Sequence, residues 1–129
     1  MEASTNDEFG HLAGDQALIT VADAARSPLR PSDLVARFGG EEFAVLLPET
    51  TLGNAESIAQ RLRAHVAKAD PGVLDNRPLP AVTISLGIAG RQPECSLDIM
   101  IAAAGVAMFH ARRNGRNRVE VAARVSLDH

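Results

Sequence analysis

The sequence predicts a layered α/β domain in which a mixed central sheet carries flanking helices. Segments with helical periodicity alternate along the chain with short strand-like segments, and a Gly-Gly pair separates two of those strands. No repeat, linker or low-complexity run interrupts this order. With 129 residues, of which 46% are hydrophobic, the chain suits one compact domain. We expect this domain to cover residues 1–123, followed by a frayed tail over 124–129.

The first predicted elements are a helix and a hairpin. Apolar residues recur at helical spacing over 14–26, and prolines then interrupt the chain at Pro28 and Pro31. Strand-like alternation follows over 33–38 and 41–47. A two-residue connection made by the intervening glycines is typical of a tight β-turn, which requires positive φ at both positions.

The second half predicts two helices and two strands. The first of these helices spans about 54–68 with Asn54 as its N-cap, and the segment 82–88 alternates as a strand with one buried face. The next helix begins after Ser96 and ends near Gly115, and 118–121 forms a final strand.

Composition excludes several classes of function. The net charge of −3 argues against a general nucleic-acid binder, and the single cysteine, Cys95, excludes an internal disulfide. The acidic start has neither the basic nor the apolar region of a signal peptide, and no apolar run approaches the roughly 18 residues of a membrane span. We therefore expect a cytoplasmic domain without membrane contact. No Walker loop is present, so a P-loop NTPase is not supported.

The residues most suited to chemistry surround the Gly-Gly pair. Gly39 and Gly40 allow a phosphate to approach the backbone, and Glu41 or Glu42 supplies the hard oxygen ligand that Mg²⁺ prefers. Neighbouring strand residues face opposite sides, so only one of these two carboxylates is expected to be the main ligand. Arg37 is placed to stabilise phosphate charge. The alternative to a functional site is an ordinary surface hairpin whose turn is flanked by charged residues.

Several motifs together resemble the diguanylate cyclase (GGDEF) family. Residues 39–43 match the hairpin from which the family takes its name, and residues 6–15 match its Asn-Asp-x-x-Gly-His-x-x-Gly-Asp segment. Residues 82–89 and 111–117 resemble its Thr-x-Ser-x-Gly-x-Ala strand and its Ala-Lys-x-x-Gly-Arg-Asn ending. The resemblance covers roughly residues 4–121 and implies a palm-like, ferredoxin-like GGDEF fold.

The resemblance also implies an activity and a set of roles. Family members condense two GTP into cyclic di-GMP at the face between two domains, so Mg²⁺ (or Mn²⁺) and a homodimer are implied. By the same resemblance Asn6 and Asp15 hold the guanine, while Arg112 and Arg116 contact the triphosphate. From the residues alone, helix capping by the two arginines remains an alternative.

The sequence departs from the family in two places. Ala104-Gly105 stands where the family has Ala-Asp, and Asn114 adds a spacer residue. Residues 1–5 contain neither the aspartate nor the lysine of the family's first strand, which binds metal and phosphate. We therefore expect an N-terminally truncated domain without that strand and with little or no activity, and we expect an unpaired sheet edge with exposed apolar surface.

A second site is implied by Arg30 and Asp33, which have the Arg-x-x-Asp form and the nine-residue offset from Gly39 of the family's product-inhibition site. Arg61 matches a further arginine used there. A turn-capping Asp33 beside a solvated Arg30 is the alternative. The chain is thus a diguanylate cyclase, an inactive module that binds cyclic di-GMP or GTP, or an interaction domain. The sequence leaves open any upstream sensory domain, its signal and a membrane anchor.

Overall fold

The computed structural model describes residues 2–4, 10–38 and 42–123. Its elements in chain order are β1 (Glu2–Ser4), α1 (Gly10–Arg26), β2 (Leu34–Arg37), β3 (Phe43–Leu46), α2 (Leu52–Lys68), β4 (Val73–Leu74), β5 (Arg77–Pro78), β6 (Thr83–Ile88), α3 (Leu97–Arg113) and β7 (Val119–Val121). The predicted order of helices, hairpin and strands is confirmed, with three short strands added.

The strands form a mixed central sheet and two separate hairpins. The central sheet has the order β1-β6-β7, with β1 antiparallel and β7 parallel to β6. Glu2 lies opposite Ser85, and Leu86 lies opposite Val119. The β2–β3 pair and the β4–β5 pair are two-stranded and antiparallel. The expectation of no strand in the first five residues is therefore wrong, because β1 pairs with β6 there.

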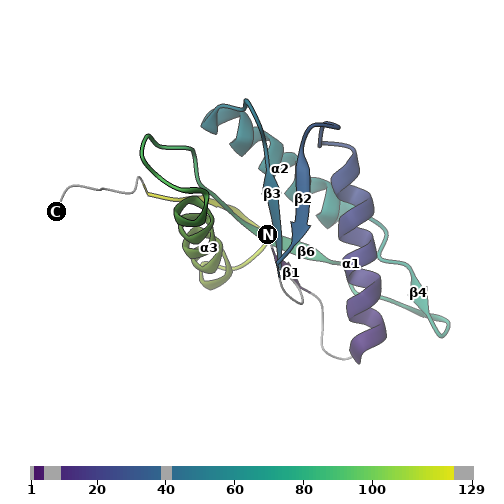
Figure 1. Ribbon diagram of the computed structural model, residues 1–129. Coiled ribbons are helices and arrows are strands. Elements are labelled where there is room, and N and C mark those ends of the chain that lie inside the picture. Colours follow the sequence, from purple (N-terminus) through teal and green to yellow (C-terminus); the bar gives the residue numbers. More distant parts are fainter. Residues whose placement is uncertain (1, 5–9, 39–41, 124–129) are drawn as a thin grey trace.

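Helices cover both faces of β6 (Figure 1). On one face, Ile84 and Leu86 join the buried core with Val21 of α1 and Leu62 of α2. On the other face lies α3, which buries Ala107, Met108 and Ala111. Successive side chains of β6 point to opposite faces of the sheet. Even-numbered residues such as Ile84 therefore face α1 and α2, and odd-numbered residues such as Gly87 face α3.

Gly87 sets the distance between α3 and the sheet. A Cβ atom at this position would overlap the backbone carbonyl oxygen of Ala104 and the backbone nitrogen of Met108. Only a residue without a side chain lets the helix backbone approach the strand so closely. The glycine of the strand motif therefore has a packing role.

The helix boundaries follow local capping chemistry. α2 begins at Leu52, and its N-cap is Thr51, whose hydroxyl accepts from the Asn54 N–H at 3.2 Å. Asn54 is therefore inside the helix and is not the cap that its type suggested. Ser96 caps α3 as predicted and accepts from the Ile99 N–H, and Gly115 follows the helix end with φ of +122°.

The β2–β3 register corrects the expected turn length. Arg37 lies opposite Phe43, and the Phe38 N–H donates to the Glu42 carbonyl at 2.8 Å. Three residues, 39–41, separate these paired positions, so the connection is longer than the two-residue turn expected from Gly39-Gly40. Those three residues lie outside the described part of the chain.

Candidate functional site

The hairpin carries two of the predicted site residues on opposite faces. Cross-strand partners point to the same side of an antiparallel ribbon, so Arg37 shares a face with Phe43. Glu42, one position earlier, faces the other side and is exposed. The register therefore places positions 37 and 42 on opposite faces of this ribbon.

Four predicted site residues lie outside the described residues. They are Asn6, Gly39, Gly40 and Glu41. The assignments of guanine binding to Asn6 and of metal binding to Glu41 therefore stay predictions.

The remaining predicted substrate residues lie on α1 and at the C-terminal end of α3. Asp15 is exposed on the second turn of α1. Arg112 is half-buried in the last turn of α3, and Arg116 follows in the turn toward β7 with φ of 61° and its N–H donating to the Ala111 carbonyl at 2.9 Å. The structure thus places the two arginines at one end of α3, and a residue other than glycine holds a left-handed backbone there.

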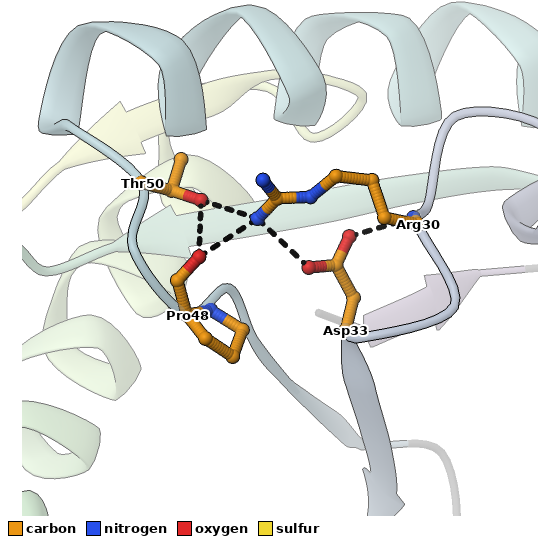
Figure 2. Close-up of polar contacts among 4 residues, drawn as sticks. All are labelled: Arg30, Asp33, Pro48 and Thr50. Atoms are coloured by element: carbon orange, nitrogen blue, oxygen red, sulfur yellow. Dashed lines mark hydrogen bonds and ion pairs between the residues drawn. The ribbon is translucent and has the colours of Figure 1, made fainter.

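Arg30 and Asp33 form the most completely described polar cluster (Figure 2). One guanidinium nitrogen, Nη2, donates to Asp33 Oδ1 at 3.1 Å, to the Pro48 carbonyl at 2.8 Å and to Thr50 Oγ1 at 2.6 Å. The Arg30 backbone N–H donates to Asp33 Oδ2 at 2.8 Å. The predicted pair is therefore brought together, and it also joins the α1–β2 turn to the β3–α2 connection.

The Asp33 carboxylate is held ionised by its neighbour. Its side chain is fully covered, while 47% of the Arg30 side chain stays exposed. Burial opposes ionisation, but the backbone and side-chain hydrogen bonds from Arg30, together with its charge, lower the pKa of Asp33 below its ordinary value. Asp33 thus orients the guanidinium and leaves the exposed part of Arg30 available to an acceptor.

Thr50 and Pro48 are partners that the sequence did not indicate. They lie 20 and 18 positions from Arg30, and neither belongs to a recognisable motif. The Thr50 hydroxyl also donates to the Pro48 carbonyl at 2.9 Å. Only the fold brings this connection beside Arg30, so no local pattern signals it.

Arg61 is not brought into this cluster. It is exposed on α2 and borders a hollow of about 420 Å³ with Gly53, Glu56, Ser57 and Gln60. It lies ten residues after Thr51, which is about 15 Å along a helix axis. No hydrogen bond or ion pair joins Arg61 to Arg30 or Asp33 among the described residues. Its place in a shared ligand site stays a prediction.

The described residues contain no group of three or more His, Cys, Asp or Glu side chains that could hold a metal ion. Mg²⁺ usually takes only one or two carboxylates, and water and substrate phosphates complete its coordination. An exposed carboxylate at Glu42 fits such a shared site.

None of the described helices is both long and apolar enough to cross a membrane.

Comparison with known protein families identifies one match over most of the chain. The family model described as "Diguanylate cyclase, GGDEF domain" matches residues 3–118. The chain is 44% identical over 117 residues to diguanylate cyclase DgcP of Pseudomonas aeruginosa, covering 91% of this chain and 17% of that protein. It is 40% identical over 114 residues to DgcM of Escherichia coli K12, covering 88% and 27% respectively. The chain therefore spans about a quarter or less of these relatives.

Solved structures share the fold. The GGDEF domain of DgcB from Caulobacter crescentus, in complex with c-di-GMP, superposes with a TM-score of 0.80 at 33% identity, covering 90% of this chain and 68% of that one. Diguanylate cyclase SiaD of Pseudomonas aeruginosa, in complex with its activator SiaC, gives a TM-score of 0.82 at 35% identity, covering 92% and 45%.

Proposed function

The chain belongs to the diguanylate cyclase GGDEF-domain family, and from this premise we propose that it acts in the condensation of two GTP into cyclic di-GMP. In this reaction each 3′-hydroxyl attacks the α-phosphate of the other nucleotide, and pyrophosphate leaves at each step. The observation that carries the proposal is the family match over residues 3–118, together with the intact sequence of Gly39 through Phe43.

Nucleotide recognition is assigned to polar residues near the start of α1. Asn6 and Asp15 offer oxygen acceptors for the N1–H and N2–H donors of guanine. Arg37, Arg112 and Arg116 would offset phosphate charge, and Gly39-Gly40 would let the phosphates approach the backbone.

Glu41 is proposed as the main Mg²⁺ (or Mn²⁺) ligand, with Glu42 beside it. When bound, the ion would supply positive charge where the leaving pyrophosphate develops negative charge. Glu41 would also accept the proton of the attacking hydroxyl, since a carboxylate within hydrogen-bond reach is a suitable base.

Catalysis is proposed to require a homodimer, because each domain would hold one GTP and present it to the other. Turnover by the chain itself is expected to be slight. Residues 1–5 contain neither the aspartate nor the lysine that the resemblance places there.

The test is to incubate the purified chain with GTP and Mg²⁺ and to separate cyclic di-GMP by chromatography. We expect slow product formation that Glu41→Gln reduces at least about a hundredfold. Glu94→Gln, which removes a charge from a loop far along the sequence from the hairpin, is the matched control and should leave the rate unchanged. Product formation that survives Glu41→Gln would overturn the assignment of Glu41.

A second function, binding of cyclic di-GMP without turnover, is favoured by the preformed Arg30–Asp33 cluster. An arginine held on one side by a carboxylate can present its remaining N–H groups to guanine O6 and N7 or to a phosphate. In calorimetry, Arg30→Ala should weaken binding at least about tenfold. Arg26→Ala removes an equal charge from an exposed pair with Asp23 and should change it less than about twofold. Equal losses in the two variants would contradict a specific site.

A further inference from the structure

The turn between α3 and β7 holds three successive residues with positive φ. They are Gly115 at 122°, Arg116 at 61° and Asn117 at 46°. The Gly115 N–H donates to the Arg112 carbonyl at 3.4 Å, and the Arg116 N–H donates to the Ala111 carbonyl at 2.9 Å, as in a Schellman motif. That motif requires a left-handed backbone only at the glycine. Asparagine tolerates this backbone but arginine rarely adopts it, so contacts beyond the helix end are needed to hold Arg116.

Arg63 of α2 contacts this turn from outside. Its Nη1 donates to Asn117 Oδ1 at 3.3 Å across 54 positions of the chain, and its Nε donates to Gln60 Oε1 at 3.0 Å. The guanidinium is planar, so the hydrogen bond from Nε to Gln60 also fixes the direction in which Nη1 points. Arg63 is half-buried, whereas Asn117 is exposed. An oriented donor on a helix of the core therefore holds the side chain of an exposed turn residue.

Arg116 is consequently held on both sides. Its own N–H is bound to a carbonyl in the last turn of α3, and the next residue, Asn117, is bound to Arg63. Beyond the turn, the Arg118 carbonyl accepts from the Leu86 N–H at 3.0 Å, which fixes the chain to the central sheet. Loss of the contact from Arg63 would let Arg116 relax toward the negative φ that arginine prefers. Its side chain would then leave the turn in another direction.

We propose that Arg63 is a positioning residue, which fixes the backbone of Arg116 and thereby the direction from which the Arg116 guanidinium approaches the triphosphate of GTP. The inference rests on the proposed function, in which Arg116 offsets phosphate charge. A guanidinium that is already held in place loses less conformational freedom when it binds a phosphate. The contact from Arg63 should therefore raise the affinity for GTP more than the affinity for GMP, which lacks the two outer phosphates.

The first test needs no ligand and measures hydrogen exchange of the Arg116 amide in the whole chain. Arg63→Met keeps an aliphatic stem but removes the donors, so this amide should exchange at least about fivefold faster. The Ile84 amide should keep its rate, because Ile84 is fully buried and reports opening of the whole domain. An unchanged rate at Arg116, or equal acceleration at both amides, would overturn the proposal.

The second test measures binding of GTP and of GMP, each with Mg²⁺, by calorimetry. Arg63→Met should weaken GTP binding at least about fivefold and change GMP binding less than about twofold. Lys68→Ala, which removes an equal charge from the last turn of α2, is the matched control and should keep both affinities within about twofold. Equal losses for the two nucleotides in Arg63→Met would contradict an effect through the phosphates.

A variant of Asn117 tests whether Arg63 acts through this residue. Asn117→Gly removes the acceptor but suits a positive φ, so it should weaken GTP binding as much as Arg63→Met, and the double variant should lose no more. Additive losses would overturn the proposal. Because Asn117 is exposed, this variant still decides should Arg63→Met fail to fold.

The wild-type titration separates this inference from the proposed function. GTP binding by the wild type that is equally tight in Arg63→Met would overturn the role of Arg63 alone. A wild-type chain that binds neither nucleotide would overturn the proposed function, and the role of Arg63 with it.

Discussion

Asp33 links the stability of the domain to pH. Because its folded-state pKa is lowered, the ionised carboxylate stabilises the fold above its unfolded-state pKa, and this stabilisation is lost as pH falls through the folded-state pKa. Asp33→Asn should therefore lower the melting temperature at neutral pH and have progressively less effect in acid. Thermal unfolding of both proteins, followed by circular dichroism from about pH 7 to about pH 3, measures this convergence.

Asp23→Asn is the control for this pH dependence. Its carboxylate makes only an exposed contact with Arg26 at 3.7 Å, so the change in stability should stay within about 0.5 kcal/mol. A constant difference between wild type and Asp33→Asn across the pH range would refute the role of the Asp33 charge.

Gly87 and Gly105 should respond oppositely to alanine. A methyl group at Gly87 would overlap the backbone of α3, so Gly87→Ala should destabilise the fold by about 3 kcal/mol. At Gly105, inside α3, nothing lies within 4 Å of an added Cβ, and alanine should stabilise the helix by about 0.5–1 kcal/mol. Urea unfolding of both variants measures the two values. A neutral Gly87→Ala would contradict the close approach of α3 to β6.

At the scale of elements, the start of α2 depends on the Thr51 hydroxyl. Thr51→Ala removes the acceptor for the Asn54 N–H and should cost about 1 kcal/mol, while Thr51→Ser keeps the acceptor and should retain most of the stability. Chemical unfolding of the two variants provides the comparison. Equal losses in both would assign the effect to the lost methyl group instead of the cap.

The sequence predicted the regular elements well because each carries its own periodic pattern. Ile58, Leu62 and Val66, spaced four residues apart in α2, are buried on one face of the helix, and the Ser96 cap is confirmed. Asn54 was wrongly predicted as the N-cap of α2 because Thr51 and Asn54 are both suited to capping, and the helix uses Thr51. β1 was missed because Glu2–Ser4 has no apolar pattern, and its strand conformation comes from pairing with β6.

The candidate site was predictable only where the partners are near in sequence. Arg30 and Asp33 are three positions apart, and a turn brings them together. Thr50 lies 20 positions from Arg30, and no local sequence pattern predicts a contact over that separation. The hairpin register places Arg37 and Glu42 on opposite faces, a separation that follows only once the strand pairing is known.

At the scale of the whole molecule, stability should be uneven. β2 is exposed along its whole length, whereas Ile84 of β6 and Val66 of α2 are fully buried. We expect amides of β2 and β3 to exchange with solvent well before those of β6, since few buried apolar contacts protect the hairpin. Native-state hydrogen exchange resolved by residue measures the order. Equal protection of the hairpin and β6 would mean that they open as one unit.

β6 takes one neighbour from the first residues of the chain and the other from near its end. Glu2 meets Ser85 and Val119 meets Leu86, so one neighbour precedes β6 by more than eighty positions and the other follows it by more than thirty. When a ribosome has just synthesised β6, its partner β1 has already been made, but its partner β7 has not. The central sheet closes only after α3 and β7 emerge, and until then the face of β6 that α3 covers and the edge that pairs with β7 are open to chaperones and to neighbouring chains.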